Sequence, residues 1–126
     1  MSIVDYEQSF ISSVLNNPQP LPDIFKILHP SDFENQDYAC IYHALQKSYS
    51  GLAMDTAVWL KKMFDFIINE YGTNETETRL ELRGLADAND PLVNPATLAR
   101  QIKKASLHRE MVQAAEAWAR FKLVQE

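Results

Sequence analysis

The chain of 126 residues has little glycine, a single cysteine and no long apolar run. Its three glycines stand apart, so they cannot form the loops that wrap backbone N–H groups round nucleotide phosphates, and this excludes P-loop and dinucleotide-binding chemistry. With Cys40 alone, no internal disulfide is possible. No stretch approaches the roughly 20 apolar residues of a membrane span, and the N-terminus lacks signal-peptide features. These absences predict a cytoplasmic protein without a membrane segment.

The composition is that of an ordinary helical domain. Apolar residues make up 46% of the chain and charged residues 23%, which are typical values for a globular protein. A length of 126 residues fits one domain with one core and is too short for two substantial domains. Scarce glycine disfavours a fold rich in strands or loops. We therefore expect an all-α globule of six or seven helices.

Charge is distributed unevenly along the chain. Residues 1–96 hold 6 basic and 14 acidic side chains, a net charge of −8, whereas residues 97–126 hold 6 basic and 3 acidic side chains, a net charge of +3. Because Lys and Arg supply most of the affinity for nucleic-acid phosphates, the acidic part disfavours direct nucleic-acid binding. Only the last segment has the charge to contact DNA or an acidic partner, and a solvated helix face explains that segment as well.

Apolar spacing and capping residues place the helices. Asp5 followed by Gln8 resembles a capping box, and Asp55 is a good N-cap. Gly51 and Gly72 stand where left-handed C-terminal caps are expected. The predicted helices are 5–16, 23–28, 36–50, 56–71, 77–88 and a long segment from Pro95 onward, with a single turn capped by Ser31 and Asp32 before Phe33.

The last predicted helix is unusually long. From Pro95 onward, no glycine or further proline interrupts the chain. A run of about 30 residues is long for a globular helix, so a break is expected near 106–109. We accordingly expect residues 1–106 to form a globule and residues 107–126 to form a C-terminal helix of the same domain.

No constellation of side chains indicates catalysis. Cys40 and His43 lie three residues apart on one predicted helix and could supply two metal ligands, but a site needs two more and only His29 and His108 remain as histidines. As a nucleophile, Cys40 would need a base held by a third group, and a small core residue is the simpler interpretation. Helix capping or a polar helix face explains the acidic residues. We expect no catalytic, cofactor-binding or metal-binding residue.

The two tryptophans have different expected surroundings. Trp59 lies in a strongly apolar helix and is expected in the core. Trp118 stands among alanines near the end of the sequence, where the pattern fits an interface anchor and an interior residue equally well. Met111, Ala115 and Phe121 share its side of the predicted helix, and small alanines there would let another helix approach closely.

Six short motifs follow one another along the chain. They are EQSFISSVL (7–15), LHPSDF (28–33), YACIYHAL (38–45), GLAMD (51–55), LARQIKKASLHRE (98–110) and EMVQAAEAWA (110–119). In this order the motifs resemble the N-terminal domain of the DnaB-type replicative DNA helicases. That family has, at similar spacings, a Leu-x-Pro-x-Asp-Phe turn, a Gly-x-x-Ile-Asp entry to a helix and a late Arg-Glu-Met that opens a helical hairpin. The resemblance covers nearly the whole chain, and it depends on the order of the motifs rather than on one of them.

The sequence also departs from that family. Ser12 stands where the family usually has glycine, and Tyr38-Ala39 replace its usual His-Arg. The polar residues 70–78 take the place of a Gly-Gly loop, and the chain stops after what would be the first helix of the hairpin. We therefore expect either a piece of a helicase or a divergent stand-alone homologue.

The resemblance implies a non-catalytic role in DNA replication. In the family, this domain is a helical globule whose hairpin pairs with that of a neighbour in the N-terminal tier of a hexameric ring. The tier docks the helicase-binding domain of primase and, in some systems, loader or inhibitor proteins. Carried over to this chain, the pairing surface would begin at Arg109, with Met111, Ala115, Trp118 and Phe121 as apolar anchors.

Two other functions are compatible with the sequence. A free-standing regulator or adaptor of phage or plasmid type would use the same fold to bind a helicase or primase in trans. A small helical enzyme of unknown chemistry belongs to a different class, and an ordered ligand in a closed polar pocket would support it. An ATPase domain downstream in the same reading frame would favour the helicase module, whereas a stop codon would favour the regulator.

Overall fold

The computed structural model describes residues 2–51, 55–88, 90 and 93–125. Within them the elements follow in the order α1 (Ile3–Asn16), α2 (Leu21–Ile24), the 3-10 turn η1 (Pro30–Asp32), α3 (Gln36–Ser48), α4 (Thr56–Tyr71), α5 (Glu75–Asp87) and α6 (Pro95–Gln125). This part of the chain contains six α-helices and no strand, which confirms the all-α prediction.

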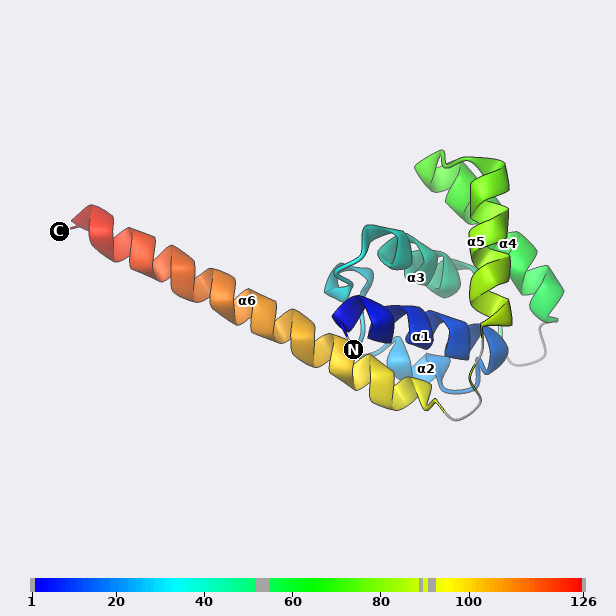
Figure 1. Ribbon diagram of the computed structural model, residues 1–126, viewed down its shortest axis with the longest axis horizontal. Helices are drawn as coiled ribbons and strands as arrows, with labels where there is room; N and C mark the ends of the chain where they lie inside the picture. Colours follow the sequence, from blue (N-terminus) through cyan, green and yellow to red (C-terminus); the bar gives the residue numbers. More distant parts are fainter. Residues whose placement is uncertain (1, 52–54, 89, 91–92, 126) are drawn as a thin grey trace.

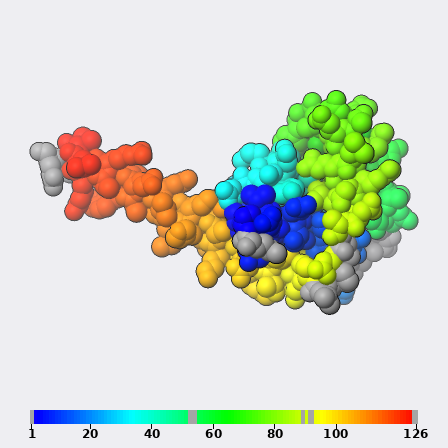
Figure 2. Space-filling model, in the orientation of Figure 1, coloured from blue at the N-terminus to red at the C-terminus, as the bar shows by residue number. Residues whose placement is uncertain are grey.

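The helices form a globule from which α6 projects (Figure 1). Helix α1 packs against α3, α5 and the first part of α6, and α4 packs against α3 and α5. Only the N-terminal part of α6 lies on the globule, and the rest extends away from it as a rod (Figure 2). The fold therefore separates a packed body from a single protruding helix.

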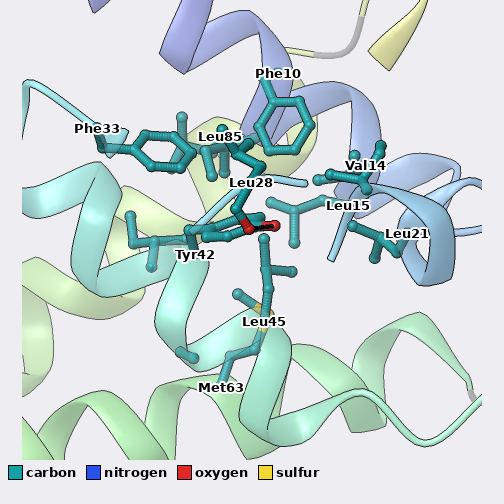
Figure 3. Packing of buried hydrophobic residues seen from close by; sticks show 14 of the residues in the cluster. Phe10, Val14, Leu15, Leu21, Leu28, Phe33, Tyr42, Leu45, Met63 and Leu85 are labelled. Atoms are coloured by element: carbon teal, nitrogen blue, oxygen red, sulfur yellow. Dashed lines mark hydrogen bonds between the residues drawn. The ribbon is translucent and has the colours of Figure 1, made fainter. Parts of the chain in front are cut away.

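The core surrounds α3, which packs against both α1 and α4. Phe10 of α1 and Tyr42 of α3 are fully buried, and their ring centroids are 5.8 Å apart. Phe33, which follows η1, brings its ring centroid to 5.0 Å from that of Tyr42 (Figure 3). Ile41 and Trp59 are also buried. The predicted core positions Phe33, Ile41, Tyr42 and Trp59 are confirmed.

Several predicted helix ends are wrong, and local hydrogen bonds explain why. Helix α1 begins two residues early because the Ser2 hydroxyl accepts the Asp5 N–H and the Asp5 carboxylate accepts the Ser2 N–H, which forms the capping box one turn before the predicted one. Asn74 caps α5 by accepting the Glu77 N–H, so α5 also begins earlier.

The second predicted helix is shorter and earlier than expected. Pro20 and Pro22 favour the first turn of a helix, so α2 starts at Leu21, and the chain passes into turns after Ile24. Ile27, which was assigned to this helix, is 44% exposed. The turn at Ser31 and Asp32 does form, as η1.

The glycine caps are half confirmed. Gly72 has φ +63° and ψ +29°, and its N–H donates to the Ile68 carbonyl, so it closes α4 in the left-handed conformation. The predicted cap at Gly51 is wrong, because α3 already ends at Ser48 and Tyr49 turns the chain into an extended conformation. Asp55 caps α4 as expected, since its carboxylate accepts the Ala57 N–H.

The expected break in the last helix is wrong. Helix α6 runs without interruption through 106–109. The sequence holds no glycine or proline there, and the side chains of Lys103, Ser106 and Arg109 are anchored to the η1 turn. These contacts stabilise the region in which a break was expected, so the helix continues beyond the globule.

Tyr42 also supplies a test of the core. Its hydroxyl is buried and donates a 2.8 Å hydrogen bond to the Leu28 carbonyl, and burial raises the pKa of this phenol (Figure 3). Tyr42→Phe is expected to lower the free energy of unfolding by about 1 to 1.5 kcal/mol, because it leaves a buried carbonyl without its donor. Urea unfolding measures the change. Tyr6→Phe is the control, and an equal loss in both variants would contradict the assignment.

Candidate interaction surface

The η1 turn positions α6 through one buried carboxylate. Asp32 is 3% exposed. Its oxygens accept the His29 backbone N–H at 2.8 Å, the Ser106 hydroxyl at 2.7 Å and the Lys103 ammonium at 3.2 and 3.3 Å. One side chain therefore joins the local turn to two residues of α6 that lie more than 70 positions further along the chain.

The contacts of Asp32 determine its charge state. Burial alone would raise the pKa of this carboxyl, but the hydrogen bonds from Ser106, His29 and Lys103 outweigh burial and lower the pKa below its usual value. Asp32 is therefore a carboxylate at neutral pH. Helix capping was the predicted role of Asp32, and the contacts with α6 add a second role that the sequence pattern did not indicate.

Arg109 completes the attachment of α6. Its guanidinium donates a 2.7 Å hydrogen bond to the backbone carbonyl of Asp32. Lys103, Ser106 and Arg109 are spaced three residues apart, so they lie on one side of α6 and turn that side towards the globule. The resemblance placed Arg109 at the start of a pairing surface. In the structure, Arg109 makes a contact within its own chain.

The same turn is held from the other side by α1. Glu7 is fully buried, and its carboxylate accepts the backbone N–H groups of Glu34 and Asn35 at 2.8 and 3.0 Å. Burial raises the pKa of Glu7, and the two hydrogen bonds offset part of that effect. Glu7 of α1 thus holds one side of the segment that joins η1 to α3. Asp32 attaches the other side to α6.

Beyond Arg109, α6 has no support from the globule. Every described side chain from Glu110 to Val124 is exposed. At 1.5 Å per residue, this stretch is a rod of roughly 22 Å. A lone helix of that length is only marginally stable in water, because most helices in proteins depend on packing of one face.

An apolar strip follows one side of this rod. Met111 is 70% exposed, Trp118 59% and Phe121 51%, and Ala115 lies between Met111 and Trp118 at helical spacing. The Trp118 and Phe121 rings stack with centroids 5.7 Å apart, and the Lys122 ammonium lies 5.7 Å from the Trp118 centroid. We call Met111, Ala115, Trp118 and Phe121 the distal strip. It is an exposed surface that includes the residue whose surroundings the sequence left open.

Cys40 and His43 have structural neighbours. The Nδ1 atom of His43 is 2.7 Å from the Tyr71 hydroxyl, and the His43 ring packs edge-on against Phe66. Burial raises the pKa of the Cys40 thiol, with partial compensation from Tyr71, so the thiol is protonated at neutral pH. Among the described residues, no three His, Cys, Asp or Glu side chains come close enough to hold a metal ion.

A groove lies between α4 and α5. It has a volume of about 690 Å³ and an apolar floor that includes Leu60, Phe64 and Leu82. Its rim carries both signs of charge, and the Arg79 guanidinium lies 5.1 Å from the Phe64 centroid. The pattern of the sequence gave no signal for this groove, because residues from two separate helices form it.

The described residues form a small helical domain with an exposed apolar strip on its last helix. None of the described helices is long and apolar enough to cross a membrane. The sequence model of the DnaB-like helicase N terminal domain family matches residues 2–104. The chain therefore belongs to that family, in which this domain is a non-catalytic part of the helicase. No curated protein and no solved structure matches it.

The family match covers the globule and ends at Lys104. It includes Asp32 and Lys103, which position the root of α6, and Glu7, which holds the adjoining turn. The distal strip lies beyond the matched residues. Its role in pairing, like the division of the domain at residue 106, stays a prediction.

Proposed function

We propose that this chain is a non-catalytic assembly and docking module of a DnaB-like replicative helicase, and that its distal strip pairs with the strip of a second copy. The observation that carries the proposal is the unsupported rod with Met111, Trp118 and Phe121 exposed along one side. Large apolar side chains grouped on a protruding helix are typical of an interface, because without a partner their apolar surface stays in contact with water.

The distribution of residue sizes favours two antiparallel helices. Ala114 and Ala115 stand midway between Met111 and Trp118. If two copies of α6 cross at these alanines, the backbones can approach closely, and Met111 of one copy faces Trp118 of the other. Such an interface uses the same surface on both copies and is closed by a two-fold axis.

We also propose that the globule docks the helicase-binding domain of primase or a helicase loader. Membership of the family supports this proposal, because docking of these proteins is the role that the resemblance implies. Isothermal titration of the chain with the primase domain tests it. Absence of heat and of any mobility shift with both primase and loader would remove the docking part of the proposal.

Trp118→Asp tests the pairing. The substitution places a charge at the centre of the proposed interface, and we expect it to weaken self-association at least about tenfold, which corresponds to 1.4 kcal/mol. Sedimentation equilibrium of the wild type and the variant measures the change. The matched control is Leu123→Asp, because Leu123 is 74% exposed and lies on a different side of α6.

The control separates pairing from a general effect of the new charge. Leu123→Asp is expected to leave the dissociation constant within about twofold of the wild type. A wild-type chain that remains a monomer at high concentration would refute the pairing. Equal weakening by both substitutions would place the contact elsewhere on α6.

A further inference from the structure

The groove between α4 and α5 has an apolar floor with helical spacing. Leu60 and Phe64 lie one turn apart on α4, and Leu82 and Ala86 lie one turn apart on α5. Leu82 is buried, whereas the other three are partly buried and pack against the edge of the core. Because each row follows the axis of its helix, the floor is an apolar track that suits side chains with the same spacing.

Small side chains line one end of this groove. Helices α4 and α5 follow each other through a short connection at Gly72 and run in opposite directions (Figure 1). Ala57, near the start of α4, and Ala86, near the end of α5, therefore belong to the same end of the groove. At the other end, the Arg79 guanidinium faces Phe64 at 5.1 Å from the ring centroid. The alanine end thus leaves room for a bulky apolar side chain.

Three cations stand on the rim of the groove. Lys61 belongs to α4, and Arg79 and Arg83 belong to α5. All three side chains are exposed, and none forms an ion pair with another described residue. Asp65 and Asp87 also line the groove, so the lining has one positive charge in excess in a chain whose net charge is −5. Cations on both walls would attract carboxylates that lie above the apolar floor.

We propose that this groove binds an acidic amphipathic helix of a partner protein. Large apolar side chains at positions i, i+4 and i+7 of that helix cover the floor, and glutamates on either side of them meet Lys61 and Arg83. From Ala57 to Phe64 the floor extends about 10 Å along α4, which is the length of two helical turns. The groove therefore has the length, the apolar spacing and the charge that such a helix requires.

The groove lies apart from the proposed pairing surface. In Figure 1, α4 and α5 stand on one side of the globule, and the distal part of α6 projects from the other side. No residue of the distal strip lines the groove. Pairing of α6 would therefore leave the groove open to a partner. The inference rests on the proposed docking role of the globule and assigns that role to one surface.

The lining favours a protein helix over a nucleic acid. Among the described lining residues Phe64 is the only aromatic one, and it is partly buried and faced by Arg79, so bases have no free ring on which to stack. The carboxylates of Asp65 and Asp87 would repel a continuous run of phosphates. A helix can instead place its glutamates opposite the cations and neutral residues opposite these two carboxylates.

A synthetic peptide tests the groove in the intact chain. The peptide is an alanine-based helix of about 18 residues, labelled with fluorescein, with leucines at i, i+4 and i+7 and glutamates on either side of them. Fluorescence anisotropy at about 0.05 M NaCl, where charge attraction is weakly screened, measures its dissociation constant. A second peptide of the same composition has its leucines dispersed round the helix. It is expected to bind at least about tenfold more weakly.

Reversal of charge on both walls tests the rim. K61E/R83E is expected to bind the glutamate peptide at least about tenfold more weakly than the wild type does. It is also expected to bind a peptide with lysines in place of the glutamates more tightly than the wild type does, and this gain shows that the variant is folded. The control K47E/K62E makes the same change in net charge at exposed sites outside the groove. It should bind both peptides within about twofold of the wild type.

Four results would overturn the proposal. Equal binding of the two leucine arrangements would leave only a general attraction between charges. Equal weakening by K61E/R83E and K47E/K62E would make net charge responsible rather than the groove. Loss of self-association in K61E/R83E would make a second copy of the chain the occupant. Displacement of the peptide by a single-stranded oligonucleotide, whose own binding K61E/R83E abolishes, would assign the groove to nucleic acid.

The primase domain and the loader separate this inference from the docking proposal on which it rests. If either protein binds the wild type at least about tenfold more tightly than K61E/R83E, that protein supplies the helix. Equal binding by the wild type and the variant would overturn the groove as the docking site and leave the docking itself intact. Absence of binding by both proteins would remove the docking proposal, and the peptide measurement then decides the groove by itself.

Discussion

Replacing Asp32 with alanine is expected to lower the free energy of unfolding by about 3 to 4 kcal/mol. The substitution leaves the His29 N–H and the Ser106 hydroxyl without their acceptor and the Lys103 ammonium without its counter-ion. Lys103 is partly exposed, so water recovers some of the loss at that end of the ion pair. Since small domains are stable by only about 5 to 15 kcal/mol, this loss is large.

Equilibrium unfolding in urea measures the effect of Asp32→Ala. The matched control is Asp23→Ala, because the Asp23 carboxylate is 90% exposed and forms only a loose ion pair. We expect that control to change stability by less than about 0.5 kcal/mol. A similar small change in Asp32→Ala would show that the contacts between η1 and α6 contribute little to folding.

The stabilisation by Asp32 should depend on pH. Its hydrogen bonds lower its pKa in the folded state, so its contribution is present above the unfolded pKa of about 3.9 and is lost as the pH falls through the folded pKa. The wild type is therefore expected to lose its advantage over Asp32→Asn in strong acid. An advantage that stays constant down to the acid transition would contradict the lowered pKa.

Replacing Glu7 with alanine is expected to cost about 2 to 3 kcal/mol. The backbone N–H groups of Glu34 and Asn35 lose their common acceptor, and a fully buried side chain is replaced by a smaller one, which leaves a cavity against the start of α3. Urea unfolding measures this change as well. Glu34→Ala removes an exposed carboxylate next to the same turn and is expected to cost less than about 0.5 kcal/mol.

The pH dependence at Glu7 has the opposite sign to that at Asp32. Burial raises the pKa of Glu7, so the folded state holds this proton more tightly than the unfolded chain does. Its contribution is full below the unfolded pKa of about 4.3 and is lost as the pH rises through the folded pKa. The stability of the wild type relative to Glu7→Gln should therefore fall as the pH rises above about 4.3. A relative stability that rises with pH above this value would contradict the raised pKa.

The helices themselves could be predicted from the sequence. Apolar spacing predicted α1, α3, α4, α5 and the start of α6, because one face of each helix must enter the core. Their ends were less certain, since several residues can cap the same helix. At α1 the Ser2 and Asp5 pair was stronger than Asp5 and Gln8, and after α3 the chain turned at Tyr49 before it reached Gly51.

The candidate surfaces could be predicted only in part from the sequence. Spacing along α6 placed Met111, Ala115, Trp118 and Phe121 on one side, and the structure adds that this side is exposed. The groove between α4 and α5 gave no signal, because Leu60 and Phe64 are separated from Leu82 by about twenty residues. A concave surface formed by two distant segments has no period in the sequence.

The sequence by itself determined the helical class, the family and the apolar side of the last helix, because each of these depends on local spacing or on the order of short motifs. Only the tertiary structure decided that α6 is unbroken and where it leaves the globule. Asp32 explains the difference: its carboxylate joins a turn near the start of the chain to Lys103 and Ser106. Contacts between residues so far apart depend on packing, which local patterns do not record.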